Sequence, residues 1–192
     1  MAPRTKQQLK ELKESRRESI LSAALKVFSA NGYDGATISH IAKEAGISKG
    51  LLYTYFESKE DLLDELLNYG LNRMGEYLTF IPEKGITTKK EFNNVLRDTI
   101  GLYAKQQEFW RLYMIVILQK EISKKFEQTM QGFMQEYLGI FATYFQKKGV
   151  ANPIAEAILL GSILDGMMMG LSIAPEMYPM DDIINLIEKK FG

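Results

Sequence analysis

The chain of 192 residues contains no cysteine, a single histidine and only five prolines. Without cysteine it can build no disulfide framework and carry out no thiolate chemistry. Because His40 has no second histidine beside it, a metal or catalytic role has little support, and we expect no metal and no cofactor. We expect His40 to lie exposed on a helix instead.

The chain also lacks a net charge, since 24 basic residues balance 24 acidic ones. The balance is uneven along the sequence, because the first 17 residues hold six basic side chains and two acidic ones. Such a local excess would suit a polyanion, and a solvated basic tail explains it equally well. The basic residues are Arg4, Lys6, Lys10, Lys13, Arg16 and Arg17.

A membrane-spanning segment and a signal peptide are not expected either. The N-terminus has no apolar stretch of the signal-peptide kind. The most apolar region, 153–174, is interrupted by Glu156 and Asp165, and a carboxylate is costly in the middle of a bilayer. We therefore expect a cytoplasmic protein that does not enter membranes. Asp165 could anchor a ligand polar group or lie hydrogen-bonded at an interface, and we favour the interface.

The sequence predicts an all-α fold, because apolar residues recur at helical spacing. A first helix is expected from about residue 15 to 31, with Asn31-Gly32 as its stop, and the segment 6–18 either extends it or forms a mobile arm. Thr37 and Ser48 are expected to cap two short helices, and Ser58 a longer one that reaches about Phe80. Further helices are expected near 89–106, 108–124, 126–148, 153–172 and 181–190.

The two short helices and the 45-AGIS-48 segment between them match a helix-turn-helix. On the second of these helices, Leu52 and Phe56 lie one turn apart and are expected to anchor it to a core. Another surface combines Lys49 with Tyr53 and Gly50 with Thr54. A cation, a phenol, a hydroxyl and bare backbone are groups that contact phosphates and base edges.

The order of residues from Ile20 to Leu63 resembles the TetR family of bacterial transcriptional regulators. The resemblance implies that Thr37 and Lys59 contact phosphates, and that Tyr55 contacts the flanking backbone. It implies that Lys49, Gly50, Leu51, Tyr53 and Thr54 face the major groove. Many members have Arg at the position of Ser39, and the basic arm could compensate for that contact from the minor groove. The positions that carry the resemblance are Phe28, Gly32, Thr37, Ile41-Ala42, Ala45-Gly46, Ser48, Gly50, Leu52-Tyr53, Tyr55-Phe56, Lys59-Glu60 and Leu62.

The C-terminal part carries many aromatic and methionine side chains at helical spacing, which ordinarily form a core. The resemblance implies two domains, a DNA-binding domain over 1–60 and a ligand-binding and dimerisation domain over 61–192. It also implies a ligand-responsive regulator, and a cavity lined by such residues would favour a hydrophobic or aromatic small molecule. The candidate ligand-binding residues are Tyr103, Trp110, Tyr113, Met114, Phe133, Met134, Tyr137 and Phe141.

The family dimerises through its last two long helices, so the resemblance implies a homodimer. A dimer would hold two recognition helices about one DNA turn apart, ~34 Å, on a palindromic operator, most simply as a repressor. The candidate interface residues are Gly161, Leu164, Met168, Leu171, Ile184 and Ile187. An alternative is an all-helical small-molecule-binding protein or enzyme whose helix-turn-helix is only structural. Against an enzyme, the sequence shows no nucleophile–base pair, metal cluster or phosphate loop.

Overall fold

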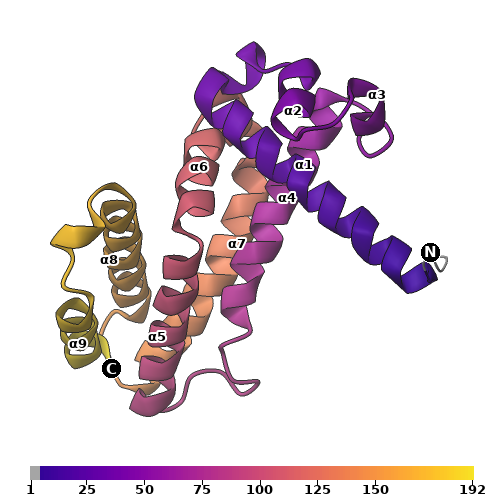
Figure 1. The fold of residues 1–192 in the computed structure, drawn as a ribbon. Coiled ribbons are helices and arrows are strands. Elements are labelled where there is room, and N and C mark those ends of the chain that lie inside the picture. Colours follow the sequence, from indigo (N-terminus) through magenta and orange to yellow (C-terminus); the bar gives the residue numbers. More distant parts are fainter. Residues whose placement is uncertain (1–4) are drawn as a thin grey trace. The chain divides into compact units, whose positions relative to one another are not determined.

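The computed structural model describes residues 5–192, and every regular element in that range is a helix (Figure 1), so the predicted all-α class is confirmed. Of the basic residues at the N-terminus, Arg4 lies outside the described residues. The helices are α1 (Lys6–Gly35), α2 (Ile38–Glu44), α3 (Lys49–Leu52), α4 (Lys59–Leu78), α5 (Lys89–Lys105), α6 (Gln107–Ile117), α7 (Lys120–Lys147), α8 (Pro153–Ile173), the short 3₁₀ helix η1 (Pro175–Met177) and α9 (Met180–Phe191).

The helix ends follow the capping residues in the sequence. The side chains of Thr37 and Ser48 accept hydrogen bonds from the backbone N–H groups of His40 and Leu51, as expected for N-caps. At the end of α1, Gly32 adopts φ +71°, a left-handed conformation that glycine tolerates without steric cost. The segment 6–18 is part of α1, so it is a helix and not a mobile arm.

The chain divides into two compact units, and the boundary differs from the one predicted at residue 60. Unit 1 takes the described residues up to Leu71 together with Leu112–Lys124, and unit 2 takes Asn72–Arg111 and Lys125–Gly192. The inserted segment belongs to unit 1 because its side chains bond there: the Tyr113 hydroxyl donates to the Leu67 carbonyl at 2.9 Å. The local sequence does not show with which unit such a segment packs.

Unit 2 is organised around a core of aromatic and aliphatic side chains from α5, α7, α8 and α9. Phe92 lies at its centre, stacked on Tyr144 at 5.0 Å and edge-on to Phe141 at 6.2 Å between ring centroids. The helix α8 contributes Ala157, Leu160, Leu164, Met167 and Leu171 to this core. These residues follow the i, i+3, i+7 spacing of one helix face, which leaves the opposite face of α8 outside the core.

Candidate nucleic-acid interface and effector cavity

The turn between α2 and α3 depends on one glycine. Gly46 adopts φ +65°, and the backbone N–H of Ile47 returns to the Ala42 carbonyl at 3.0 Å. A residue with a Cβ atom is strained in this conformation. Gly46 therefore fixes the direction in which α3 leaves α2.

The segment from Lys49 to Phe56 has a buried side and an exposed side. Leu52 and Phe56 are fully buried, as predicted, and hold α3 to the core of unit 1. Tyr53 is 46% exposed and Leu51 is 40% exposed, although large apolar groups are usually hidden. The other predicted groove residues, Lys49, Gly50 and Thr54, are exposed as well, and Tyr55 is half-buried. The structure thus brings these side chains to one surface.

Within that surface, Gly50 is not required by the protein's own packing. A Cβ atom at Gly50 would meet no other atom within 4 Å, and its φ is not positive. Glycine costs roughly 0.5–1 kcal/mol relative to alanine inside a helix. Gly50 therefore leaves bare backbone on the exposed surface, where its own chain does not require a glycine.

Lys59 has a different role in the free protein from the phosphate contact predicted for it. Its ammonium donates to the carbonyls of Tyr33 and Ala36 at 2.7 and 3.1 Å and lies 4.3 Å from the centroid of the Tyr33 ring. The last carbonyls of a helix attract a cation, which explains this placement. In the single chain Lys59 ties α4 to the end of α1, and its predicted phosphate contact stays a prediction.

Gln119, which is distant in sequence, also bonds to this stretch of α1. The sequence patterns do not predict this role. Its side-chain oxygen accepts from the Tyr33 N–H at 2.8 Å, and its amide nitrogen donates to the Phe28 carbonyl at 3.1 Å. Gln119 lies in the break between α6 and α7, whereas the sequence predicts this break near residue 125. No glycine or proline marks this break, so no local signal could have placed it.

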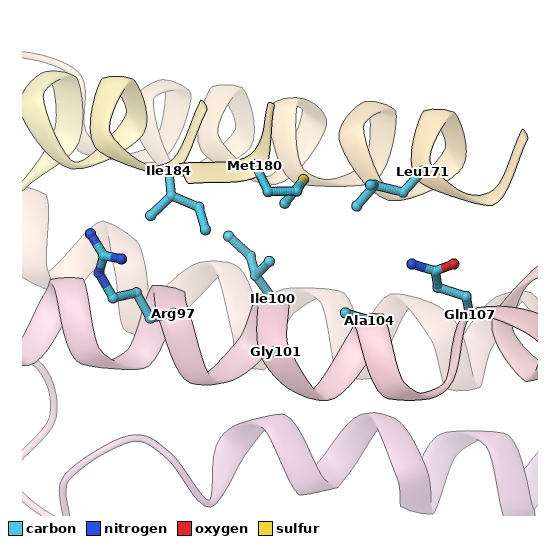
Figure 2. Close-up of a pocket in the computed structure, with 8 residues that line it drawn as sticks. All are labelled: Arg97, Ile100, Gly101, Ala104, Gln107, Leu171, Met180 and Ile184. Atoms are coloured by element: carbon cyan, nitrogen blue, oxygen red, sulfur yellow. The ribbon is translucent and has the colours of Figure 1, made fainter. Parts of the chain in front are cut away.

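Unit 2 contains a cavity of about 310 Å³, shown in Figure 2. Side chains from α5 and the start of α6 point across it toward side chains of α8 and α9. Gly101 and Ala104 leave the space open because their side chains are small. At one end, the Arg97 guanidinium pairs with the Glu188 carboxylate at 2.6 and 3.0 Å. The lining residues are Arg97, Ile100, Gly101, Ala104, Gln107, Leu171, Met180 and Ile184.

A smaller, more polar cavity of about 230 Å³ adjoins the first, because both include Gln107. Its other lining residues are Glu108, Arg111 and Ser172. The hydroxyls of Ser172 and Tyr103 lie 2.7 Å apart. An apolar hollow thus adjoins one lined by charged and hydroxyl groups.

Residues 20–66 match the family described as "Bacterial regulatory proteins, tetR family". These residues belong to the TetR family, as predicted. The chain is a ligand-responsive transcriptional regulator with a helix-turn-helix DNA-binding module.

Individual relatives extend the likeness beyond that module. The fatty acid metabolism regulator protein of Bacillus subtilis is 28% identical over 153 residues, which are 75% of this chain and 77% of that protein. The regulator AcrR of Shigella flexneri is 32% identical over 125 residues, 62% of this chain but only 54% of AcrR. The crystal structure of FadR from Bacillus subtilis in complex with stearoyl-CoA superposes with a TM-score of 0.68 at 22% identity, covering 91% of this chain and 96% of that one. That structural likeness shows a shared fold.

The predicted ligand-binding residues do not line the cavity of unit 2. Met114 and Met134 are 48% and 40% exposed, and Tyr113 is buried in unit 1. Trp110 and Phe141 are buried in unit 2, Tyr103 donates to the Met168 carbonyl, and Phe133 stacks on Tyr137. Burial raises the pKa of Tyr137 to about 12, and the Asp165 carboxylate adds to the shift. These aromatic residues mainly fill the protein interior, and the space arises where small residues occur.

The predicted interface residues also face inward. Leu164, Leu171, Ile184 and Ile187 are each less than 8% exposed in the core of unit 2, and Met168 packs against that core. Gly161 faces Leu138 of the same chain. Leu164, Leu171, Ile184 and Ile187 therefore pack within the single chain, whereas Gly161 and Met168 are partly exposed, and their place in a dimer interface stays a prediction. The outward face of α8 is a different stripe, made of Ile158, Ser162, Asp165, Met169 and Ile173.

Proposed function

We propose that this regulator binds a palindromic DNA operator as a homodimer in the cytoplasm, represses transcription there, and is released by an amphipathic small molecule with an apolar chain. The observation that carries the DNA part is the exposed surface of α3. Lys49 and Tyr53 lie together, with the ammonium 5.9 Å from the ring centroid. A cation and a phenol beside bare backbone at Gly50 suit phosphates and base edges in a major groove.

Dimerisation is supported by the outward stripe of α8. Its apolar members are strongly exposed in the single chain, with Met169 at 67%, Ile173 at 71% and Ile158 at 48%. α8 is also long and apolar enough to cross a membrane by length and composition alone, with a mean hydropathy of 1.6 in its most apolar window. Because its inner face is packed in the unit 2 core and Asp165 lies in the outer stripe, we assign the stripe to a second copy and not to lipid.

The effector class follows from the two adjoining cavities. The larger one offers Ile100, Met180 and Ile184 to an apolar chain, and its volume is at the small end of the ligand-pocket range, about 300–1,000 Å³. The smaller one offers Arg111 and Ser172 to a polar or anionic head, and the Glu108 carboxylate lines it as well. The stearoyl-CoA in the FadR structure has this combination of an apolar chain and an anionic head, so we propose an acyl thioester or a molecule of similar shape.

Release requires the effector to favour a form of the protein that binds DNA poorly, and the shift cannot exceed its difference in affinity for the two forms. α4, α6 and α7 each contribute residues to both units. We propose that these continuous helices carry the change from the cavities to the helix-turn-helix, and that α6, which runs from Gln107 to the Gln119 turn, is the shortest connection.

The test begins by selecting duplexes from a random pool with the purified protein and measuring binding to the selected and a scrambled sequence. Acyl-CoA of increasing chain length is then added, with CoA alone as the control. We expect selective binding and release that grows with chain length. Equal binding to selected and scrambled duplexes would refute the DNA assignment. Selective binding that no acyl-CoA disturbs would refute the effector class alone.

A further inference from the structure

The first three turns of α1 form a helix that projects from the rest of unit 1 (Figure 1). Residues 5–16 are all exposed, and burial begins only at Ile20. The helix nevertheless starts with a complete capping box, in which Thr5 and Gln8 exchange hydrogen bonds of 3.0 and 3.2 Å. Its sequence therefore specifies an ordered helix where no core requires one.

One face of this helix is basic at its N-terminal end and apolar further along. Lys6, Lys10, Lys13 and Arg17 follow each other at spacings of four, three and four residues, which places them on one face. The same face continues into Ile20, Ala24 and Phe28, which are buried in unit 1. The basic face therefore points to the side of α1 against which the other helices of unit 1 pack.

Arg17 fixes that direction at the point where the helix leaves the core. Its guanidinium pairs with the Glu65 carboxylate of α4 at 2.7 Å and lies 4.9 Å from the ring centroid of Phe56, just beyond α3. The three lysines before it are exposed and have no ion pair among the residues that the structure describes. The acidic residues Glu11 and Glu18 lie on another face, and Glu14 lies at the edge of the basic face, four residues after Lys10.

We propose that Lys6, Lys10 and Lys13 form a helical extension of the DNA interface that binds the phosphate backbone beside the bases contacted by α3. The inference rests on the proposed DNA-binding function. A helix about 10–12 Å across does not fit a minor groove roughly 6 Å wide, so the minor-groove contact expected of a flexible arm is replaced by phosphate contacts. From Lys6 to Arg17 the helix is about 16 Å long, which is roughly five base pairs of duplex.

The test replaces all three lysines by glutamine, as Lys6→Gln, Lys10→Gln and Lys13→Gln together, since glutamine is also a good helix former. The matched control carries Lys84→Gln, Lys89→Gln and Lys90→Gln, three exposed lysines of unit 2 with the same change in charge. Binding to a duplex selected by the wild-type protein is measured from low to high salt. Circular dichroism verifies that both variants keep their helix content.

For each phosphate contact that is lost, the slope of log affinity against log salt is expected to fall by about 0.9. Three contacts per protomer would lower affinity by roughly tenfold or more near 0.1 M salt, with the base preference unchanged. A duplex trimmed by about five base pairs at each end should reduce the difference between wild type and variant. The control is expected to bind like wild type.

An unchanged salt slope in the triple variant, with wild-type DNA binding intact, would overturn this inference alone. Leu9 and Leu12 are 53% and 47% exposed on the same projecting helix, so a second copy is the competing occupant. If Leu9→Ser with Leu12→Ser lowers the molecular mass in ultracentrifugation and the lysine variant keeps its slope, the helix serves self-association. If the wild-type protein selects no DNA, the proposed function fails and this inference fails with it.

Discussion

α3 and α8 both expose large apolar side chains, but their surroundings differ. Beside the exposed Leu51 of α3 and Tyr53 directly after it lie a lysine, a hydroxyl and an uncovered glycine backbone. The outward stripe of α8 is mostly aliphatic and carries one carboxylate, Asp165. A mixed surface suits a hydrated, charged partner such as DNA, whereas an aliphatic surface suits a partner that excludes water. The two helices therefore point to two kinds of partner.

The largest effect is expected from a charge placed in the outward stripe of α8. Met169→Asp would put an unpaired carboxylate in each half of a two-fold interface, at several kcal/mol per dimer, so we expect a monomer at micromolar concentration. Met134→Asp on α7 is the matched control, because Met134 is also exposed. Ultracentrifugation distinguishes the two. A Met169→Asp protein that sediments as the wild-type dimer would show that α8 is not the interface.

On α3, removing a groove-facing side chain should affect DNA binding without changing the oligomer. We expect Lys49→Ala and Tyr53→Ala each to cost about 1–3 kcal/mol of specific binding, roughly 5- to 150-fold in affinity. Gel shifts on the selected duplex measure the loss, and Lys124→Ala, an exposed lysine of unit 1 outside the helix-turn-helix, serves as the control. Wild-type affinity in both variants would contradict the role of α3.

The two helices also differ in how far their sequences could be interpreted. Around α3, the caps Thr37 and Ser48 and the buried Leu52 and Phe56 follow from local chemistry, and the structure has them as predicted. α8 is apolar on nearly all sides, so periodicity cannot distinguish its core face from its outer face. The cavity was missed for a related reason. It lies where Gly101 and Ala104 face α8 and α9, an arrangement that depends on contacts between helices distant in sequence.

Gln119→Leu is expected to have an intermediate effect. Gln119 bonds within unit 1 through contacts that the sequence pattern does not predict. Gln119→Leu keeps the size of the side chain but removes its hydrogen bonds to the Tyr33 N–H and the Phe28 carbonyl, at roughly 1–3 kcal/mol of stability. Because both groups lie at the end of α1 that precedes α2, DNA affinity should fall as well. Urea unfolding and gel shifts measure the two effects. Gln146, an exposed glutamine on α7, provides the control Gln146→Leu. If the two variants have equal stability and DNA affinity, Gln119 does not stabilise the end of α1.

Gly50→Ala should separate stability from DNA binding. Because a Cβ atom there meets nothing, we expect stability to be unchanged or to rise by up to about 1 kcal/mol, while DNA affinity falls as the methyl group blocks close approach. Gly132→Ala on α7 is the matched control, since Gly132 has the same open space. It should gain the same stability and bind DNA normally. Undiminished DNA binding by Gly50→Ala would mean that the bare backbone at this position has no partner.

The smallest expected effect concerns the start of α5, where unit 2 has a local signal as clear as those in unit 1. Glu91 accepts from the Thr87 hydroxyl at 2.7 Å and from the backbone N–H groups of Thr87 and Thr88 at 2.8 and 2.9 Å. These hydrogen bonds lower the pKa of Glu91 to about 2, and the bond from the Thr87 hydroxyl has the largest effect.

A carboxylate whose pKa is lower in the folded chain stabilises it above the unfolded pKa, about 4.3, and this contribution is lost as the pH falls from there toward 2. Glu91→Gln should therefore be less stable than wild type at neutral pH, with a difference that shrinks as the pH falls through that window. Urea unfolding at several pH values measures it, with Glu83→Gln, in the exposed loop before α5, as the control. A difference that stays constant with pH would show that the charge on Glu91 does not stabilise the start of α5.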